Sequence, residues 1–220
     1  MCSVPRFYEK VYQTLLKKIE MASSTKQKLF NTAISVGKRV SEHQRKEEAV
    51  PFFLQLKYKL FNSLIFKKIK NEFGGNLAFL PVGGAALKKE ISEFFSAINM
   101  PVIVGYGLTE TSATVTAYPF KNFIHGSVGK ILPGVDLKIG ADDEILIKYG
   151  GVMRGYYKNE EETAKVFTPD GYFRTGDAGK LDEEGNLYIT DRIKDLMKTS
   201  NGKYIAPQII EIPLQTHHDI

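Results

Sequence analysis

Three short segments combine glycine with oxygen-bearing side chains, the residue types that bind phosphate, sugar hydroxyls and divalent cations. The first runs from Gly105 to Ser112 and contains Thr109 and Glu110. Glycine lets backbone N–H groups approach an anion, a threonine hydroxyl binds a phosphate oxygen, and a carboxylate binds Mg²⁺. By itself this segment fits an ordinary capped turn equally well.

The other two segments lie closer to the C-terminus. Tyr172 to Asp177 places an aspartate directly after Gly176, where its carboxylate can accept two hydrogen bonds from a ribose diol. Gly-Asp is also a common turn. Asp191 to Lys198 alternates acidic and basic residues, a pattern that also fits a surface ladder of ion pairs contributing little to stability.

The elements that position the first segment form a βαβ pattern. Leu77 to Val82 is a short apolar run ending in Gly83-Gly84, a helical apolar face follows between Leu87 and Ile98, and Pro101 to Val104 is a second apolar run ending at Gly105. Such a unit predicts two parallel strands. Functional loops lie at the carboxyl ends of parallel strands, where both glycine-bearing turns are expected.

The flanking regions have different periodicities. Residues before Asn71 repeat apolar side chains at helical spacing, whereas apolar and polar residues alternate from Gly126 onward. The predicted fold class is therefore α/β: N-terminal helices lead into a parallel βαβ sheet subdomain, followed by a small antiparallel β subdomain, a partial barrel. The predicted segments are 1–72, 73–125, 126–190 and 191–220.

Composition excludes several classes of protein. Hydrophobic residues make up 43% and charged residues 25% of the 220 residues, as in ordinary globular domains. The single cysteine, Cys2, excludes an intramolecular disulfide, and with 4 histidines it leaves no plausible structural zinc site. We find no apolar stretch long enough to span a membrane. Charged residues at the N-terminus argue against a signal peptide, so we expect a cytoplasmic location.

The net charge of +5 conceals an asymmetry. Met1 to Asn71 contains 15 Lys and Arg against 5 Asp and Glu, whereas the remainder contains 15 against 20. A basic block allows contact with anionic lipid or nucleic acid. A solvated helical face rich in lysine explains the same pattern, and both interpretations stay open.

Taken together and in this order, the segments are far more specific than any one alone. The chain resembles the AMP-forming acyl-CoA synthetases of the adenylate-forming ligase superfamily over roughly Asn76 to Glu211. The matching strings are Gly83-Gly84-Ala85-Ala86-Leu87, Gly105 to Glu110, Gly126-Ser127-Val128-Gly129, Pro133-Gly134, Tyr172 to Asp177, and Asp191 to Glu211. Val4-Pro5-Arg6-Phe7 and Gly202 to Pro207 look like the long-chain fatty acid branch, although aryl, luciferase-like and peptide-synthetase relatives share the main strings.

This resemblance implies a two-step ligase reaction. A fatty acid attacks the α-phosphate of ATP to give acyl-AMP and pyrophosphate, and the thiol of coenzyme A then displaces AMP. The implied partners are the fatty acid, ATP and CoA, with Mg²⁺ as cofactor. Peripheral attachment to the inner face of a membrane would suit an insoluble substrate, and no nucleic-acid partner is expected.

The resemblance also implies roles for individual residues. Gly83, Gly84 and Ala85 would line the adenine and acyl pocket, Tyr106 would stack on adenine beside Gly107, and Thr109 would contact phosphate, while Glu110 would hold Mg²⁺. Asp177 would bind both ribose hydroxyls, and Arg192 the ribose or phosphate. Lys194 would lie at the hinge of a mobile C-terminal domain, and Lys198 would serve thioester formation.

Two elements of the resembled family have no counterpart in this sequence. Nothing before Phe73 resembles its Ser/Thr/Gly-rich phosphate loop, and no lysine corresponds to the one near the end of its C-terminal domain. We therefore expect a central fragment of a ligase that is inactive without the missing N-terminal and C-terminal domains, and that exposes an apolar face. Two alternatives stay open: a non-catalytic nucleotide- or acyl-binding protein of the same fold, and a basic module that binds lipid or nucleic acid.

Overall fold

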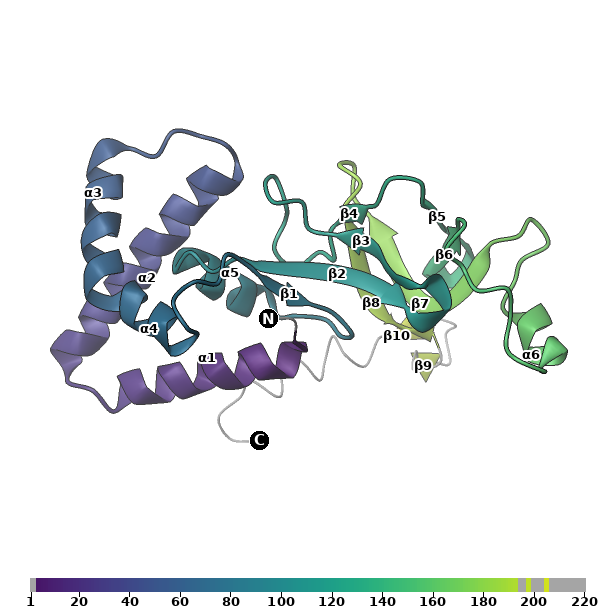
Figure 1. Cartoon of the computed structure of the whole chain (residues 1–220), viewed down its shortest axis with the longest axis horizontal. Helices are drawn as coiled ribbons and strands as arrows, with labels where there is room; N and C mark the ends of the chain where they lie inside the picture. The colour runs from purple at the N-terminus through teal and green to yellow at the C-terminus, as the bar shows by residue number, and fades with distance from the viewer. Residues whose placement is uncertain (1–2, 194–196, 199–203, 206–220) are drawn as a thin grey trace. The chain divides into compact units, whose positions relative to one another are not determined.

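The computed structural model describes residues 3–193, 197–198 and 204–205. The chain divides into two compact units, whose helices and strands are labelled in Figure 1. The first unit comprises Met1–Gly105 and Ala117–Gly126, and the second comprises Tyr106–Thr116 and Ser127–Ile220. The division into 1–72, 73–125, 126–190 and 191–220 stays a prediction.

The first unit begins with helices, as its periodicity predicts. Their bounds are α1 Pro5–Glu20, α2 Ser24–Arg45, α3 Phe52–Phe61, the π-helical η1 Asn62–Phe66, and α4 Lys67–Glu72. Pro5 occupies the first turn of α1, where a missing N–H is tolerated, and Pro51 stands immediately before α3. No helix in the part of the chain that the structure describes is long and apolar enough to cross a bilayer.

The predicted βαβ unit is confirmed. Strand β1 (Leu80–Val82) pairs in parallel with β2 (Val102–Leu108), with Leu80 opposite Val102, and α5 (Lys89–Ala97) connects them. The core of this unit gathers on α5, whose Phe95 is fully buried and meets the ring of Tyr8 edge-on at 5.6 Å. Helix α2 also packs against α5.

The second unit is built mainly of strands. It contains the end of β2, η2 Thr109–Thr111, β3 Ala113–Ala117, β4 Lys130–Ile131, β5 Asp136–Ile139, η3 Ala141–Asp143, β6 Glu144–Lys148, α6 Glu160–Lys165, β7 Phe173–Leu181, β8 Leu187–Arg192, β9 Met197–Lys198 and β10 Tyr204–Ile205. Strands β5 to β8 form a four-stranded sheet in sequence order, with every neighbouring pair antiparallel. The small antiparallel subdomain is thus confirmed.

Local signals in this unit predicted its turns and its helix start. The β5–β6 hairpin pairs Leu137 with Ile147 around a four-residue connection. The side chain of Asn159 accepts a hydrogen bond from the backbone N–H of Glu162 at 3.2 Å, which makes it the expected N-cap of α6. The helix expected to begin at Pro207 lies outside the described residues.

One expectation about the first glycine segment is wrong. Gly105 to Gly107 do not form a turn, because β2 continues through them to Leu108. A Cβ atom on Gly107 would overlap the carbonyl oxygen of Ala113 in β3. Glycine within a strand can mark a close approach of two backbones rather than a reversal of the chain.

Candidate functional site

The candidate site centres on Asp177, a carboxylate in β7 that is 4% exposed. Its Oδ2 accepts a hydrogen bond from the hydroxyl of Tyr106 at 2.7 Å, and its Oδ1 lies 3.0 Å from Nε of Arg192. Burial raises the pKa of Asp177, whereas Tyr106 and Arg192 oppose that shift by stabilising the charged form. All three sequence-predicted residues therefore meet in one cluster of the second unit.

Two irregularities in strand pairing bring Asp177 to this position. Glu144 pairs with Ala178 and Leu146 with Arg174, so residues 175–177 of β7 stand opposite Ile145 alone. The pairing of β7 with β8 also shifts register immediately after Ala178. Bulges of this kind change the direction of side chains that would alternate between the two faces of the sheet in a regular strand.

The glycine before Asp177 is therefore part of a bulge and not of a chain-reversing turn. Gly176 has φ +71°, in the left-handed region that glycine adopts without strain. Its N–H donates to Oε1 of Glu144 at 3.2 Å, and Glu144, 5% exposed, also pairs with Arg174 at 2.8 Å. The bulge is thus held by a buried, paired carboxylate.

Thr175 completes this support. Its hydroxyl donates to the carbonyl of Ile145 at 2.8 Å and accepts the N–H of Asp177 at 3.1 Å. Sequence reasoning did not identify Thr175 or Glu144 as supporting residues. The matching string contained Thr175, but its role depends on a register shift that periodicity does not reveal.

Tyr106 reaches Asp177 from the end of β2. Burial, and secondarily the charge of Asp177, raise the pKa of its hydroxyl well above its usual range, so it remains a hydrogen-bond donor. Gly107 follows, and its contact with Ala113 lets β2 and β3 approach closely. Ser112, between these strands, and Ala113, the first residue of β3, have φ +47° and +81°. Such strained backbone is found at tight turns and functional sites.

Glu110 lies in η2, between β2 and β3. Its Oε1 accepts a hydrogen bond from the hydroxyl of Tyr156 at 3.2 Å, and its backbone carbonyl accepts the N–H of Met153 at 2.7 Å. Tyr149 donates to the carbonyl of Thr111, so residues 149–156 hold this loop at several points. Thr109, beside Glu110, presents an exposed side chain. Nothing in the sequence periodicity pointed to Tyr149, Met153 or Tyr156.

The carboxylate of Glu110 fits a cation that the protein and a substrate bind jointly. Within the described ranges, no group of three or more His, Cys, Asp or Glu side chains could hold a metal ion. Mg²⁺, however, is commonly bound by one or two carboxylates together with substrate phosphates. A single half-buried carboxylate with one oxygen free of Tyr156 suits that mode.

The remaining predicted residues are not brought into this cluster. Gly83, Gly84 and Ala85 follow β1 in the first unit, where Gly84 has φ +85°. Lys194 lies outside the described residues, and Lys198 belongs to β9, opposite Tyr204 of β10, with its side chain also outside the description.

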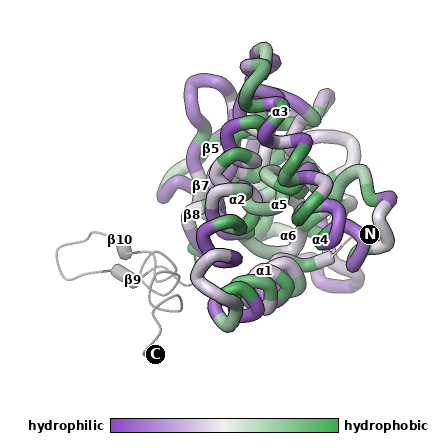
Figure 2. Tube along the Cα trace, turned by 90° about the vertical axis from the view of Figure 1, so that its left-hand side faces the viewer, coloured by the Kyte–Doolittle hydropathy of each residue, from purple (hydrophilic) through white to green (hydrophobic). Residues whose placement is uncertain are grey.

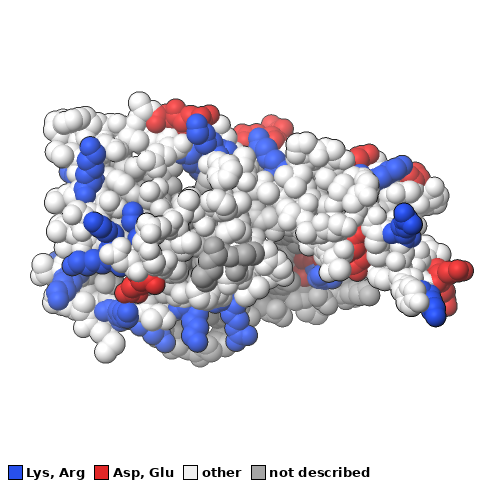
Figure 3. All heavy atoms as spheres, in the orientation of Figure 1, with Lys and Arg blue, Asp and Glu red and all other residues white. Residues whose placement is uncertain are grey.

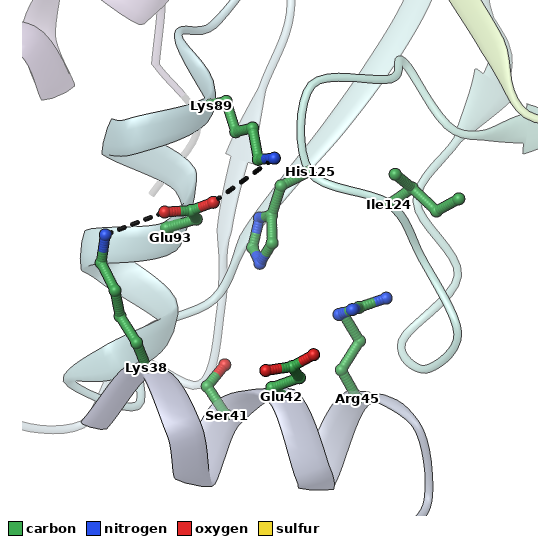
Figure 4. A pocket seen from close by; sticks show the side chains of 8 residues that line it. All are labelled: Lys38, Ser41, Glu42, Arg45, Lys89, Glu93, Ile124 and His125. Atoms are coloured by element: carbon green, nitrogen blue, oxygen red, sulfur yellow. Dashed lines mark hydrogen bonds and ion pairs between the residues drawn. The ribbon is translucent and has the colours of Figure 1, made fainter. Parts of the chain in front are cut away.

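A separate hollow lies in the first unit (Figure 4). It is lined by Lys38, Ser41, Glu42, Arg45, Lys89, Glu93, Ile124 and His125. Its charges are largely engaged with one another: Lys38 pairs with Glu93 at 2.8 Å, and Arg45 donates to the carbonyl of Phe123 at 2.6 Å. Burial lowers the pKa of His125 to about 4, so its ring is neutral near pH 7.

Known proteins resemble this chain over nearly its whole length. It is 38% identical over 216 residues to long-chain-fatty-acid–CoA ligase FadD15 of Mycobacterium bovis, covering 98% of this chain and 35% of that protein. It is 36% identical to long-chain-fatty-acid–CoA ligase 3 of Saccharomyces cerevisiae, covering 96% of this chain and 30% of that one. The chain thus spans about a third of the length of these relatives.

Solved structures agree with the sequence comparisons. O-succinylbenzoate coenzyme A synthetase (MenE) of Bacillus subtilis, in complex with ATP and magnesium ion, superposes with a TM-score of 0.57 at 33% identity over 63% of this chain and 31% of that one. The sequence profile of the AMP-binding enzymes matches residues 1–157. The chain therefore belongs to the AMP-binding enzyme family.

Proposed function

We propose that this chain supplies the nucleotide-binding residues of a long-chain-fatty-acid–CoA ligase. In the proposed reaction, a fatty acid carboxylate displaces pyrophosphate from ATP to form acyl-AMP. The thiol of CoA then displaces AMP to form the thioester. One observation carries the proposal: Asp177 is a buried carboxylate, fixed through both oxygens by Tyr106 and Arg192.

The proposed role of Asp177 is to bind the ribose diol. A carboxylate has about four acceptor positions on its two oxygens, and Tyr106 and Arg192 occupy two of them. One position per oxygen is left, which matches two adjacent hydroxyls. Tyr106 stays anchored by its hydroxyl while its ring is available to stack on adenine, with Gly107 beside it. Gly83, Gly84 and Ala85 would line the adenine and acyl pocket.

Thr109 and Glu110 are proposed to act at the phosphates. The exposed Thr109 hydroxyl can donate to a phosphate oxygen. Tyr156 orients the Glu110 carboxylate through Oε1 and leaves Oε2 available to a cation. Mg²⁺ bound there would neutralise the charge that develops on the phosphates. Preorganised groups of this kind lower the barrier because they need no rearrangement during the reaction.

Later steps involve residues near the C-terminus. Arg192 is proposed to contact ribose or phosphate, and its side chain, 57% exposed even though Nε is paired with Asp177, is accessible to such a ligand. Lys194 is proposed as the hinge of a domain rotation and Lys198 as a residue of the thioester-forming state. Since long-chain fatty acids partition into lipid, a cytoplasmic protein attached peripherally to a membrane is part of the proposal.

The proposal is tested by fatty-acid-dependent ATP–pyrophosphate exchange. We would assay this chain and the complete reading frame that contains it, since the curated relatives are about three times as long. We expect exchange with the complete frame and none with the 220 residues alone. Asp177→Ala in the complete frame should reduce exchange at least about a hundredfold, because the site loses its central acceptor.

A surface variant provides the matched control. Asp170→Ala removes an exposed carboxylate in the second unit that pairs with Lys138, and exchange should be unchanged. Absence of exchange with any acyl acid, combined with measurable AMP binding, would replace this proposal with the non-catalytic nucleotide-binding alternative. Exchange by the 220 residues alone would contradict the expectation that further domains are needed.

A further inference from the structure

The hollow of the first unit is lined almost entirely by polar and charged side chains (Figure 4). Its volume is about 290 Å³, and every residue that lines it belongs to the first unit. Helix α2 forms one wall with Lys38, Ser41, Glu42 and Arg45, whose spacing of three and four residues places them on one face of the helix. The beginning of α5 and residues 124–125 form the other walls. Hydrogen-bond donors from three segments therefore surround one small space.

Both carboxylates of the hollow are already paired with lysines. Oε1 of Glu42 lies 2.9 Å from Nζ of Lys46. Glu93 is contacted by two lysines, because Nζ of Lys38 lies 2.8 Å from its Oε2 and Nζ of Lys89 lies 3.8 Å from its Oε1. One acid with one base, and one acid with two bases, leave an excess of one positive charge among these groups.

Arg45 adds a second positive charge that has no carboxylate partner. Its Nη1 donates to the carbonyl of Phe123 at 2.6 Å, and the carbon of its guanidinium lies 5.9 Å from the centre of the Phe123 ring. Within the described ranges, no Asp or Glu oxygen lies within 4.0 Å of a nitrogen of Arg45. A guanidinium has five N–H groups in a planar fork, so Arg45 keeps donors for a ligand. Figure 4 shows its side chain extending from α2 into the hollow.

The imidazole of His125 supplies a neutral donor from the third wall. Its Nδ1 lies 2.7 Å from Oγ of Ser92, a residue of α5 that is 1% exposed. When the hydroxyl donates to Nδ1, the proton of the neutral ring is on Nε2. Burial and then the charge of Arg45 lower the pKa of His125 to about 4, and the carboxylate of Glu93 only partly opposes them. The ring therefore stays neutral at pH 7 in surroundings of net positive charge.

The wider surroundings of the hollow also favour negative charge. Helix α5 begins at Lys89, and the N-terminal end of a helix carries the positive end of its dipole. Figure 2 shows hydrophilic residues recurring between hydrophobic ones along the helical part of the chain. On the face shown in Figure 3, basic side chains gather over this part. The ligand that complements the hollow is therefore an anion.

We propose that the hollow binds a phosphate group with two negative charges, either inorganic phosphate or the terminal group of a phosphomonoester. The fork of Arg45 matches two oxygens of a phosphate, and Lys89 and Nε2 of His125 reach the remaining oxygens from the other walls. Ser41 adds a hydroxyl from α2. The two charges of the phosphate match the excess of two positive charges in the lining. This inference does not rest on the proposed function, because none of these residues is assigned to the nucleotide.

Other occupants fit the hollow less well. A metal cation would add charge to a lining that already has an excess of positive charge, and the described part of the chain contains no metal-binding group of three His, Cys, Asp or Glu side chains. A carboxylate ligand has one negative charge and two oxygens in one plane, so it would engage Arg45 and leave half of the excess charge uncompensated. A tetrahedral dianion uses donors from all three walls.

The test is equilibrium dialysis of the chain against radiolabelled inorganic phosphate at constant ionic strength. We expect saturable binding of one phosphate per chain, which sulfate displaces and acetate does not. Arg45→Gln should weaken binding at least about tenfold, and Arg45→Lys should recover part of the loss because it keeps the charge without the fork. Arg39→Gln is the matched control: it removes the same charge from an exposed position of α2 outside the hollow, and it should bind like the parent.

Two further variants keep the test independent of folding. Lys89 is exposed and Glu93 retains its pair with Lys38, so Lys89→Gln should preserve the fold and weaken phosphate binding about threefold. Glu42→Gln removes a carboxylate from the lining and should strengthen binding by about the same factor. A gain in affinity is an effect that loss of folded protein does not produce.

A second readout places the phosphate beside His125. Bound phosphate should raise the pKa of the His125 ring, followed by NMR titration, because a nearby negative charge favours the protonated form. Absence of saturable binding, or equal binding by the parent and Arg45→Gln, overturns the proposal, and the hollow is then a hydrated crevice. Asp177→Ala should leave phosphate binding unchanged. Loss of binding in that variant would assign the phosphate to the nucleotide site and also overturn the proposal.

Competition with larger ligands identifies the source of the phosphate group. Displacement of labelled phosphate by CoA but not by dephospho-CoA would assign the hollow to the phosphomonoester of CoA. Failure of both to compete would assign it to free phosphate. Both results support the site, whereas equal displacement by CoA and dephospho-CoA would show that the phosphomonoester is not the group recognised.

Discussion

The two compact units place charged and apolar side chains in opposite ways. Among the described residues, the buried charged groups Glu144, Asp177 and Asp191 all belong to the second unit. Exposed large hydrophobic side chains are concentrated in the first, and in the second only Tyr156 and Tyr157 qualify among the residues described. One unit buries charge and the other exposes apolar surface.

Buried charge in the second unit and exposed apolar surface in the first each reduce the stability of the folded chain, so folding alone does not explain them. A buried carboxylate must be paired and hydrogen-bonded, as Glu144 and Asp177 are, or it destabilises the fold by several kcal/mol. Exposed apolar surface forgoes the stabilisation of burial and promotes association. The difference indicates that the second unit is organised around a small polar ligand, and the first around an extended apolar surface.

The largest effects are expected where each unit brings two backbones close together. In the first unit, a Cβ on Gly37 of α2 would overlap the carbonyl of Ala97 in α5. In the second, Gly107 has the same relation to Ala113. Each glycine-to-alanine change should lower the free energy of unfolding by about 3 kcal/mol through overpacking, measured by urea denaturation of the chain. Only Gly107→Ala should also weaken AMP binding, because it displaces the neighbouring Tyr106.

Gly150→Ala is the control for both variants. No atom lies within 4 Å of the added carbon, and the φ of Gly150 lies outside the left-handed region. Its free energy of unfolding should therefore change by less than about 0.5 kcal/mol. If Gly37→Ala weakened AMP binding as strongly as Gly107→Ala does, the two units would not have the separate roles inferred from their surfaces.

The sequence predicted the helices and strands better than it predicted where the chain turns and where strands pair. Helices, the βαβ unit, the β5–β6 hairpin and the Asn159 cap follow from periodicity and local capping, which involve residues near one another in the chain. The strand through Gly105 and Gly107 was interpreted as a turn, and a turn at Gly176 was left open as the alternative to a ribose contact by Asp177. A glycine in a sequence does not say whether it reverses the chain or admits a distant backbone, and that distinction depends on pairing between strands.

For the candidate site too, the sequence identified individual residues but not the contacts between them. Asp177, Tyr106 and Glu110 were identified because they recur in recognisable strings, although only the fold brings Tyr106 and Asp177 within 2.7 Å across 71 residues. Tyr156, Thr175 and Glu144 were missed, since each acts by holding another residue. Supporting residues carry no motif of their own, and their roles follow from three-dimensional contacts alone.

Lowering the pH is expected to remove stability from the first unit through His125 and to add stability to the second unit through Asp177. In the first unit, burial and then the charge of Arg45 lower the pKa of His125 to about 4, and its Nδ1 lies 2.7 Å from Oγ of the buried Ser92. The unfolded chain takes up this proton near the ordinary pKa of about 6.5. Stability from neutral His125 is therefore complete above about pH 6.5 and is lost as the pH falls toward 4, by on the order of 2 kcal/mol.

In the second unit, the raised pKa of Asp177 works the other way. Its charged form is disfavoured in the folded state, so protonation relieves that cost as the pH falls. The measurement is the urea-unfolding free energy between about pH 7 and pH 4.5. His125→Gln should flatten the acid-induced loss, whereas Asp177→Asn removes the opposing contribution and should make that loss larger. An unchanged pH dependence in His125→Gln would mean that the histidine is solvated in the folded chain.

The smallest expected effect concerns the orientation of Glu110. Tyr156→Phe removes the hydroxyl that donates to Oε1 of Glu110 at 3.2 Å, whereas the N–H of Met153 still donates to the backbone carbonyl of Glu110 at 2.7 Å. The loop therefore stays in place and only the carboxylate gains freedom. We expect a change of less than about 0.5 kcal/mol in stability, and a rise of about threefold in the Mg²⁺ concentration that half-saturates exchange by the complete protein.

Tyr157→Phe is a matched control, because its side chain is 88% exposed and its neighbour carries the contact with Glu110. Binding of Mn²⁺ in the presence of ATP, followed by electron paramagnetic resonance, gives a readout that does not depend on turnover. If both phenylalanine variants shift the cation dependence equally, the effect belongs to the loop as a whole. If neither does, Oε1 of Glu110 needs no fixed orientation, and the preorganisation inferred for the second unit is confined to Asp177 and its partners.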